Sequence, residues 1–270
     1  MASPRSLKGS EVQQISCILL PRFNMMGMVS LLEPTRIANY LSDAPLYTHS
    51  FHAAEAGKVT SSNGMEVTCM GLPGKLTRDD IVFVAGSWGA ENYRDPALLA
   101  WLRRKARLGI RLCAIEIASY VFARAGLLAG RQATTHWSYL AGFQEKFPDI
   151  LAAEQLFTID GNIMTCAGST AASDLMLHLI QEDHGAPLVG EISDIIMHAR
   201  NCPSRGYLTA SVGAAIQPDD RLFRGAVRHA LAPTARTGLA DFHRSQRARD
   251  IRGIRVQLAF TFRLCVPKML

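Results

Sequence analysis

The stretch IRLCAIEIASYVFARAGLL, residues 110–128, decides the fold. Its first part, Ile110 to Ile115, is a short apolar run typical of a buried parallel strand. Its second part, Ile117 to Leu128, is predicted to be the helix that follows. Ligands in open parallel sheets bind at the carboxyl ends of the strands. Glu116, which lies on the turn between this strand and this helix, is therefore a candidate binding residue.

The same alternation of strand and helix continues on both sides of this stretch. It predicts an α/β fold with an open, mostly parallel, doubly wound sheet and helices on both faces. Two more candidate binding loops are Gly86-Ser87-Trp88-Gly89 and Ala167-Gly168-Ser169-Thr170. The predicted strands are Ile15–Leu20, Ile81–Ala85, Leu156–Ile159 and Asn162–Cys166, with a hairpin turn at Asp160-Gly161. The predicted helices are Met28–Leu41, Asp95-Pro96 to Gly109, Ala171–His184 before Gly185, and Pro187 to about Arg200.

Composition and motifs are those of an ordinary globular protein, since 48% of the 270 residues are apolar and 19% are charged. The chain contains no P-loop and no G-x-G-x-x-G motif, and no cofactor is expected. The polar N-terminus, residues 1–12, is predicted to be disordered. The apolar run after it is too short for a signal peptide or a membrane span. We therefore expect a cytoplasmic protein with no membrane partner.

The cysteines give no sign of a metal site or a disulfide framework. None forms a C-x-x-C pair, and most lie inside apolar runs, which predicts buried free thiols. They are Cys17, Cys69, Cys113, Cys166, Cys202 and Cys265.

The basic excess of the chain lies in its last quarter. Residues 201–270 hold 12 Arg and Lys, 4 Asp and no Glu, a net charge of +8. The first 200 residues hold 17 basic and 19 acidic residues, a net charge of −2. A basic terminal segment indicates either a polyanionic partner such as DNA or a solvated, poorly structured tail.

Five segments of the chain resemble one protein family. They are LPRF at 20–23, LEPTRIAN at 32–39, AGLLAG at 125–130, ATTHW at 133–137 and TCAGSTAASDLM at 165–176. Their order and spacing over roughly residues 13–200 resemble the ligand-sensing domain of GlxA-type, AraC-family transcriptional regulators. That domain has a ThiJ/PfpI-like fold, which is flavodoxin-like and class I glutamine amidotransferase-like. The resemblance implies a homodimeric regulator that binds DNA and a small nitrogenous effector, an amino acid or a quaternary amine.

The chain departs from the catalytic members of this family where their reaction takes place. Their cysteine nucleophile matches Glu116 here, and the carboxylate that supports it matches Gly27. A reactive cysteine must be a thiolate, which requires a group that lowers its pKa. Cys113 lies upstream within the strand, and His136 matches the family histidine. The resemblance therefore implies a protein without enzymatic activity. The alternatives are a ThiJ/PfpI-like hydrolase or glyoxalase-type enzyme and a purely structural or interaction protein.

The candidate ligand-binding residues come from the three loops and the family histidine. They are Gly86, Ser87, Trp88, Glu116, Ile117, His136, Gly168, Ser169 and Thr170. Glu116 is either a carboxylate held by amides of the helix N-terminus or an acid that contacts the ligand. His136 is either a partly buried, hydrogen-bonded residue or a ligand contact. Trp88 and Trp137 belong either to the core or to the pocket wall.

The segment after Arg200 differs from what the family leads us to expect. AraC-family regulators continue into a DNA-binding domain with two helix-turn-helix units. The 70 residues that follow here show neither the apolar periodicity nor the glycine turn of such units. We therefore expect residues 201–270 to form a basic tail in place of a complete helix-turn-helix domain, with a truncated or altered DNA-binding part.

Overall fold

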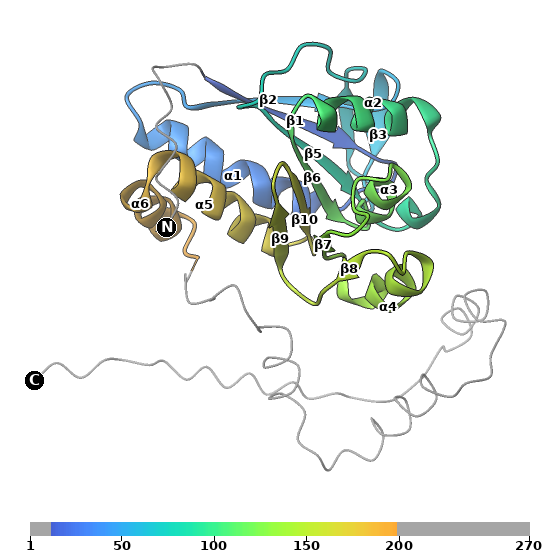
Figure 1. The fold of residues 1–270 in the computed structure, drawn as a ribbon. Coiled ribbons are helices and arrows are strands. Elements are labelled where there is room, and N and C mark those ends of the chain that lie inside the picture. The colour runs from blue at the N-terminus through green and yellow to red at the C-terminus, as the bar shows by residue number, and fades with distance from the viewer. Residues whose placement is uncertain (1–11, 199–270) are drawn as a thin grey trace, which may run out of the picture. The chain divides into compact units, whose positions relative to one another are not determined.

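A six-stranded sheet forms the centre of the computed structural model, which describes residues 12–198 (Figure 1). In spatial order its strands are β2 (Tyr47–His52), β1 (Gln13–Leu19), β5 (Ile81–Gly86), β6 (Arg111–Glu116), β10 (Ile163–Cys166) and β9 (Phe157–Asp160). The first five run parallel, and β9 runs antiparallel to β10. The succession of strands reverses between β1 and β5, as in flavodoxin-like sheets. The predicted fold class is confirmed.

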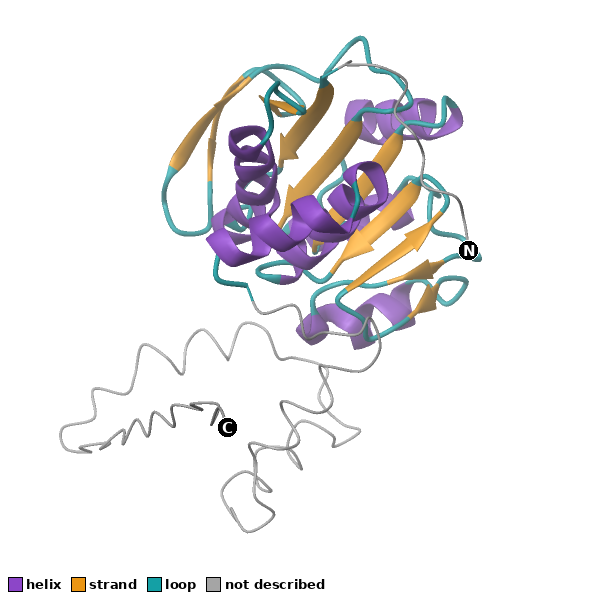
Figure 2. Ribbon diagram, turned by 90° about the vertical axis from the view of Figure 1, so that its left-hand side faces the viewer, coloured by secondary structure: helices purple, strands orange, loops and turns teal. Residues whose placement is uncertain are grey.

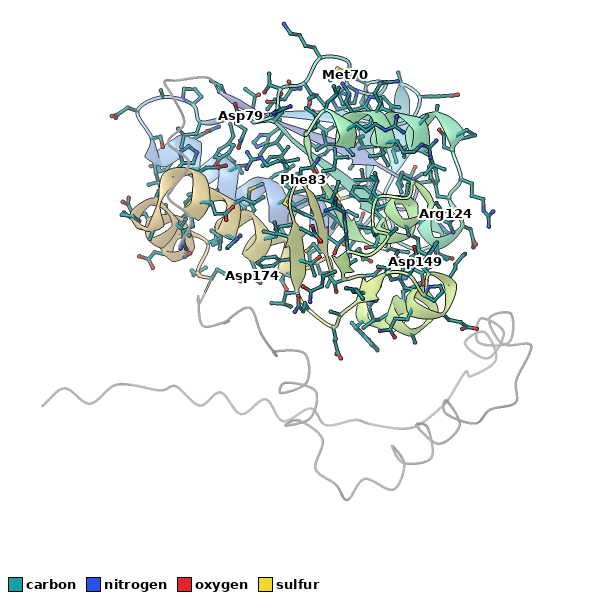
Figure 3. All side chains as sticks on the ribbon, viewed as in Figure 1. Met70, Asp79, Phe83, Arg124, Asp149 and Asp174 are labelled. Carbon is teal, nitrogen blue, oxygen red and sulfur yellow. The ribbon has the colours of Figure 1, made fainter. Side chains whose placement is uncertain are left out.

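Helices cover both faces of the sheet (Figure 2). One face carries α1 (Met25–Leu41), α5 (Ala171–His184) and α6 (Ala186–Ile195), and the other carries α2 (Pro96–Arg107) and α3 (Ser119–Arg124). Because side chains alternate along a strand, Cys17 of β1 belongs to the first core and Ile18 to the second. Phe83 on β5 is fully buried in the middle of the domain (Figure 3). Its burial stabilises the fold by about 1.5–3 kcal/mol.

Local signals in the sequence determine where two helices begin and end. The side chain of Asp95 accepts a hydrogen bond from the backbone N–H of Leu98 at 2.7 Å, and Pro96 opens α2. Gly109 follows the end of α2 with a φ of +78°, and Gly185 ends α5 with a φ of +91°. A glycine adopts this left-handed backbone without the steric cost that a side chain brings. These predicted boundaries are confirmed.

Two predicted helices are shorter than expected. The prediction of a helix over Ile117–Leu128 is wrong at both ends, because α3 spans only Ser119–Arg124. Residues 116–118 form the turn that precedes it, and Gly126, with a φ of +73°, ends the helical path after it. The prediction that the last helix reaches Arg200 is also wrong, since α6 ends at Ile195.

Several short elements escaped prediction. The strand β2, with the sequence YTHSFH, lies at the sheet edge and is half-buried, so it shows neither an apolar run nor a clear alternation. The helix α4 (Trp137–Lys146) packs Tyr139 and Phe143 against the second core, where Phe143 contacts other aromatic rings. The elements concerned are β2, the ribbon β3 (Gly57–Thr60) and β4 (Glu66–Cys69), η1 (Ala90–Asn92), α4 (Trp137–Lys146), and the pair β7 (Gln132–Ala133) and β8 (Leu151–Ala152).

The described part of the chain ends beside the first turn of α5. The Nε2 atom of His198 lies 2.9 Å from Oδ1 of Asp174. Asp174, which is labelled in Figure 3, is in that first turn. The neighbouring residue of the same turn, Ser173, donates a hydrogen bond from its Oγ to the carbonyl oxygen of Ser30 in α1 at 3.0 Å. The start of α5 is thereby connected to α1 and to the chain segment that follows α6.

The predictions on thiols are confirmed for the described cysteines. Cys17, Cys69, Cys113 and Cys166 are buried and free. Cys202 and Cys265 lie outside the described residues. The predicted basic tail at 201–270 lies outside them too, as do residues 1–11 of the start that was predicted to be disordered over residues 1–12. Among residues 12–198, no helix is both long and apolar enough to cross a membrane.

Candidate functional site

Glu116 lies at a sharp turn between β6 and α3 and has a φ of +61°. A non-glycine residue in this left-handed region is strained, so the surrounding structure must hold it there. Its carbonyl oxygen accepts hydrogen bonds from Ser119 Oγ at 3.0 Å and Thr135 Oγ1 at 2.9 Å. The next backbone N–H, that of Ile117, donates to the carbonyl oxygen of Gly86 at 3.1 Å.

A buried chain of hydroxyl groups supports this turn from behind. Ser119 Oγ also lies 2.8 Å from the carbonyl oxygen of Thr134, so its one proton is shared between two carbonyl oxygens. The N–H of Thr134 donates to Thr165 Oγ1 at 2.7 Å. Thr165 Oγ1 in turn pairs with Thr158 Oγ1 at 2.6 Å. A buried polar network whose members are all hydrogen-bonded makes a local structure rigid. The turn at Glu116 is therefore fixed before any ligand arrives.

The carboxyl group of Glu116 is buried, with only 4% of the residue exposed. Its Oε1 accepts a hydrogen bond from Ser87 Oγ at 2.9 Å, whereas its Oε2 has no partner among the described residues. Burial raises the pKa of this carboxyl, and hydrogen bonding from the side chains of Ser87 and Asn24 acts against that rise. The Asn24 amide does not complete a hydrogen bond to Oε2, because its Nδ2 donates to Ser169 Oγ instead. The interpretation that amides of the helix N-terminus hold the carboxylate is wrong. A buried acceptor without a partner is costly, and a ligand donor removes that cost.

The loop before α5 closes over Glu116. Gly168 has a φ of +99°, and a Cβ built on it would lie 2.8 Å from the Cβ of Glu116. Next to it, Ser169 Oγ accepts a hydrogen bond from Asn24 Nδ2 at 3.2 Å. A Cβ on Gly27, the position matched to the supporting carboxylate, would lie 3.3 Å from the N atom of Ser169. The loops at Gly86, Glu116 and Gly168 therefore come together, as the sequence predicted.

The remaining predicted site residues have different surroundings. His136 is half-buried at the start of α4, where its Nδ1 lies 2.8 Å from Ser138 Oγ. Burial lowers the pKa of its imidazole, which favours the neutral form. Trp88 and Trp137 are 59% and 65% exposed, so neither belongs to the core. Ile117, in contrast, is 1% exposed and packs in the second core. Thr170 is exposed.

Residues 22–182 match the DJ-1/PfpI family. The chain belongs to the DJ-1/PfpI family. It is 41% identical over 190 residues to the HTH-type transcriptional regulator CdhR of Pseudomonas aeruginosa, covering 70% of this chain and 56% of CdhR. It is 36% identical over 207 residues to the HTH-type transcriptional regulator GlxA of Rhizobium meliloti, covering 75% of this chain and 64% of GlxA. The chain thus spans less than two thirds of the length of either relative.

A solved structure has the same fold as this DJ-1/PfpI domain. It is the crystal structure of an AraC family transcriptional regulator from Pseudomonas putida, with a TM-score of 0.60 and 22% sequence identity. The similarity covers 68% of this chain and 99% of the solved chain. The resemblance to GlxA-type regulators that rested on five sequence segments is confirmed.

The chemistry available at this DJ-1/PfpI site is that of a carboxyl group. The nearest cysteines on β6 and β10, Cys113 and Cys166, are fully buried. Burial raises the pKa of Cys113 well above its usual value and that of Cys166 to about 12, so both are thiols at neutral pH. Within residues 12–198, no three His, Cys, Asp or Glu side chains are grouped so that they could hold a metal ion. The site is suited to bind a cation or a hydrogen-bond donor.

Sequence reasoning missed three polar residues at this site. Arg22 follows β1, has a φ of +60°, and places its Nη2 atom 2.6 Å from where a Cβ on Gly89 would lie. Tyr139 has a pKa raised by burial and further by Glu91, while Arg22 lowers it and Glu116 raises it. The ring of Tyr139 lies 6.5 Å from that of His136. Asn24 caps α1 and binds the loop at Ser169. The position of Arg22 and Asn24 after the first strand was the available signal.

Proposed function

We propose that residues 13–200 are the effector-binding domain of a transcriptional regulator and that Glu116 binds the effector. The observation that carries this proposal is the unpartnered, buried Oε2 of Glu116 on a rigid turn at the carboxyl end of β6. The names of CdhR and GlxA, both HTH-type transcriptional regulators, support the regulatory role. In this role the partners are DNA and a second copy of the chain, because such regulators read paired half-sites as dimers.

The charges around the site favour a small nitrogenous metabolite, an amino acid or a quaternary amine. The Glu116 carboxylate attracts a cationic nitrogen, because opposite charges in a partly desolvated site interact strongly. The exposed indoles of Trp88 and Trp137 offer faces for a cation–π contact. Arg22 supplies the opposite charge that an amino acid or betaine carboxylate requires.

The ligand contacts that we propose come from the loops around Glu116. They are Gly86, Ser87, Trp88, Glu116, His136, Gly168, Ser169 and Thr170. Ile117 supports the turn through its backbone, because its side chain lies in the core.

A thermal-shift screen of the full chain tests this proposal. We expect an amino acid, betaine or polyamine to raise the melting temperature, because a ligand at 100 times its Kd stabilises a fold by about 2.7 kcal/mol. The screen is run at constant ionic strength, with sodium chloride and neutral polyols as controls. A complete absence of hits among cationic and zwitterionic amines, with a neutral metabolite as the best ligand, would contradict the proposed charge pairing.

We also propose that this domain is not an enzyme of the hydrolase or glyoxalase type. The turn carries a carboxyl group in place of a thiol, and the described cysteines of the adjacent strands are buried thiols. We expect no turnover of esters, amides or methylglyoxal above background, and none after Glu116→Cys, because Gly27 supplies no carboxylate to that thiol. Turnover by the unmodified chain that disappears in Glu116→Gln would overturn this interpretation.

A further inference from the structure

A concave surface lies at the opposite end of the sheet from Glu116. It is a groove of about 410 Å³ between the last turns of α2, the loop after α3 and the start of β10. Glu116 ends β6, whereas Ile163, which lines the groove, begins the parallel strand β10. The groove is therefore at the amino ends of the strands and shares no residue with the proposed effector site.

The groove is lined by three arginines and by no acidic residue. Arg103 and Arg107 come from α2, and Arg131 comes from the loop before β7. Arg131 forms an ion pair with Asp160 at 2.6 Å. Within residues 12–198, neither Arg103 nor Arg107 takes part in an ion pair. Two guanidinium groups are thus available to an anion, with a third beside them.

One hairpin holds both walls of the groove. The Nδ2 atom of Asn162, at the turn between β9 and β10, donates to the carbonyl oxygens of Ala106 at 3.1 Å and Ile110 at 2.9 Å. The Nη1 atom of Arg131 donates to the backbone carbonyl of Asp160 on the same hairpin at 2.9 Å. Hydrogen bonds to this hairpin therefore fix the backbone at the end of α2, which carries Arg103 and Arg107, relative to the side chain of Arg131.

The helix dipole explains only part of this arrangement. Basic residues in the last turn of a helix are favoured by the carbonyl groups there, and α2 has Arg104, Lys105 and Arg107 in its last turn. That effect does not account for Arg131, which belongs to another segment. The helix dipole also does not account for the concave shape of the groove. Its lining includes Gly126, which has a φ of +73°, and a Cβ built on Gly126 would have no atom within 4 Å.

We propose that this groove binds a small multivalent anion, a metabolite with two or more phosphate or carboxylate groups. Each guanidinium presents N–H groups in a planar fork that matches an oxyanion in two places. A single charge would gain little at so open a site, whereas several charges on one molecule engage several arginines together. The volume is in the range that small-molecule sites occupy.

The test is binding of pyrophosphate and of citrate to the full chain by titration calorimetry at fixed ionic strength. We expect both to bind, and we expect the double variant Arg103→Gln, Arg107→Gln to bind at least 10-fold more weakly. Ala129→Glu, which places an acid in the lining, is a second variant with the same expected loss. The matched control is Arg104→Gln, an exposed neighbour that does not line the groove and is expected to bind as the unmodified chain does.

The variants also separate this groove from other basic parts of the molecule. The segment 201–270 is common to all of them, so its contribution cancels in each comparison. Glu116→Gln is expected to leave pyrophosphate binding unchanged, because Glu116 lies at the other end of the sheet. Equal binding by the unmodified chain and both groove variants overturns the proposal. Loss of duplex DNA binding in the groove variants, without any pyrophosphate or citrate binding, overturns it in favour of a macromolecular partner.

Discussion

Glu116→Gln weakens the binding of a cationic effector by about 2 kcal/mol, roughly 30-fold in Kd, if the proposed site is correct. The amide keeps the size of the side chain and can still accept the hydrogen bond from Ser87. What it removes is the negative charge opposite the ligand nitrogen. The measurement is titration calorimetry with the strongest ligand of the thermal-shift screen.

The pH dependence of binding is an independent test of whether the charge on Glu116 binds the ligand. Burial raises the pKa of Glu116 from its ordinary value of 4.5, so the carboxyl is partly protonated in the pH range above that value. A cation prefers the ionised form, and its affinity therefore rises with pH until Glu116 is fully ionised. The stability of the unliganded protein depends on pH in the opposite direction, because folding raises the pKa of Glu116. The stability that Glu116 contributes is fully present below pH 4.5 and is lost as pH rises through the folded pKa. The affinity of Glu116→Gln is expected to be flat over this range.

Glu33→Gln is the matched control. Glu33 is an exposed glutamate on α1 that pairs with Arg36 at 2.6 Å, so its replacement removes the same charge elsewhere on the domain. It is expected to change the affinity by less than about twofold, because exposed pairs contribute little. Equal affinities of the unmodified chain and Glu116→Gln would show that the ligand does not contact the carboxylate.

Gly168→Ala is expected to destabilise the domain by about 2–4 kcal/mol. The backbone at Gly168 has a φ of +99°, which strains any side chain, and the new Cβ would lie 2.8 and 2.9 Å from Cβ and Cγ of Glu116. Glu116 cannot move away easily, because the hydroxyl network holds its backbone. The melting temperature should fall by roughly 4–16 °C.

Gly190→Ala is the control for this substitution. Gly190 lies within α6, and a Cβ there would have no atom within 4 Å. Alanine in a helix interior is favoured over glycine by about 0.5–1 kcal/mol, so this variant should melt at the same or a slightly higher temperature. If Gly168→Ala melts within 1–2 °C of the unmodified chain, the loop before α5 adapts more readily than the close packing on Glu116 indicates.

The sheet and its binding edge could be predicted because their signals are local. Buried strands such as IVFVAG are continuous apolar runs, and each parallel strand must end at the same edge. The shared edge predicted that the loops of Gly168 and Glu116 are neighbours, but it could not show that a Cβ on Gly168 would collide with the side chain of Glu116, because that depends on the φ of +99° at Gly168. Ile117 was assigned to the site as a neighbour of Glu116 in the chain. The turn directs its side chain into the core between β6 and α3.

Other site residues were hidden by a misplaced boundary. The first helix was predicted from Met28, although Asn24 accepts hydrogen bonds from the N–H groups of Met26 and Gly27 and so starts α1 three residues earlier. With that start, Arg22 and Asn24 belong to a tight connection at the binding edge rather than to a loose loop. The signal for the true start of α1 was Asn24, a capping residue before a methionine-rich stretch. The helical spacing of apolar residues after Met28 outweighed it in the prediction.

The hydrogen bond between His198 and Asp174 connects the last described residue to the first turn of α5, which begins at a loop of the proposed effector site. Asp174 lies within one helical turn of the loop at Gly168, Ser169 and Thr170, three of the proposed ligand contacts. A displacement of the first turn of α5 would therefore reach His198 directly, through one side-chain contact.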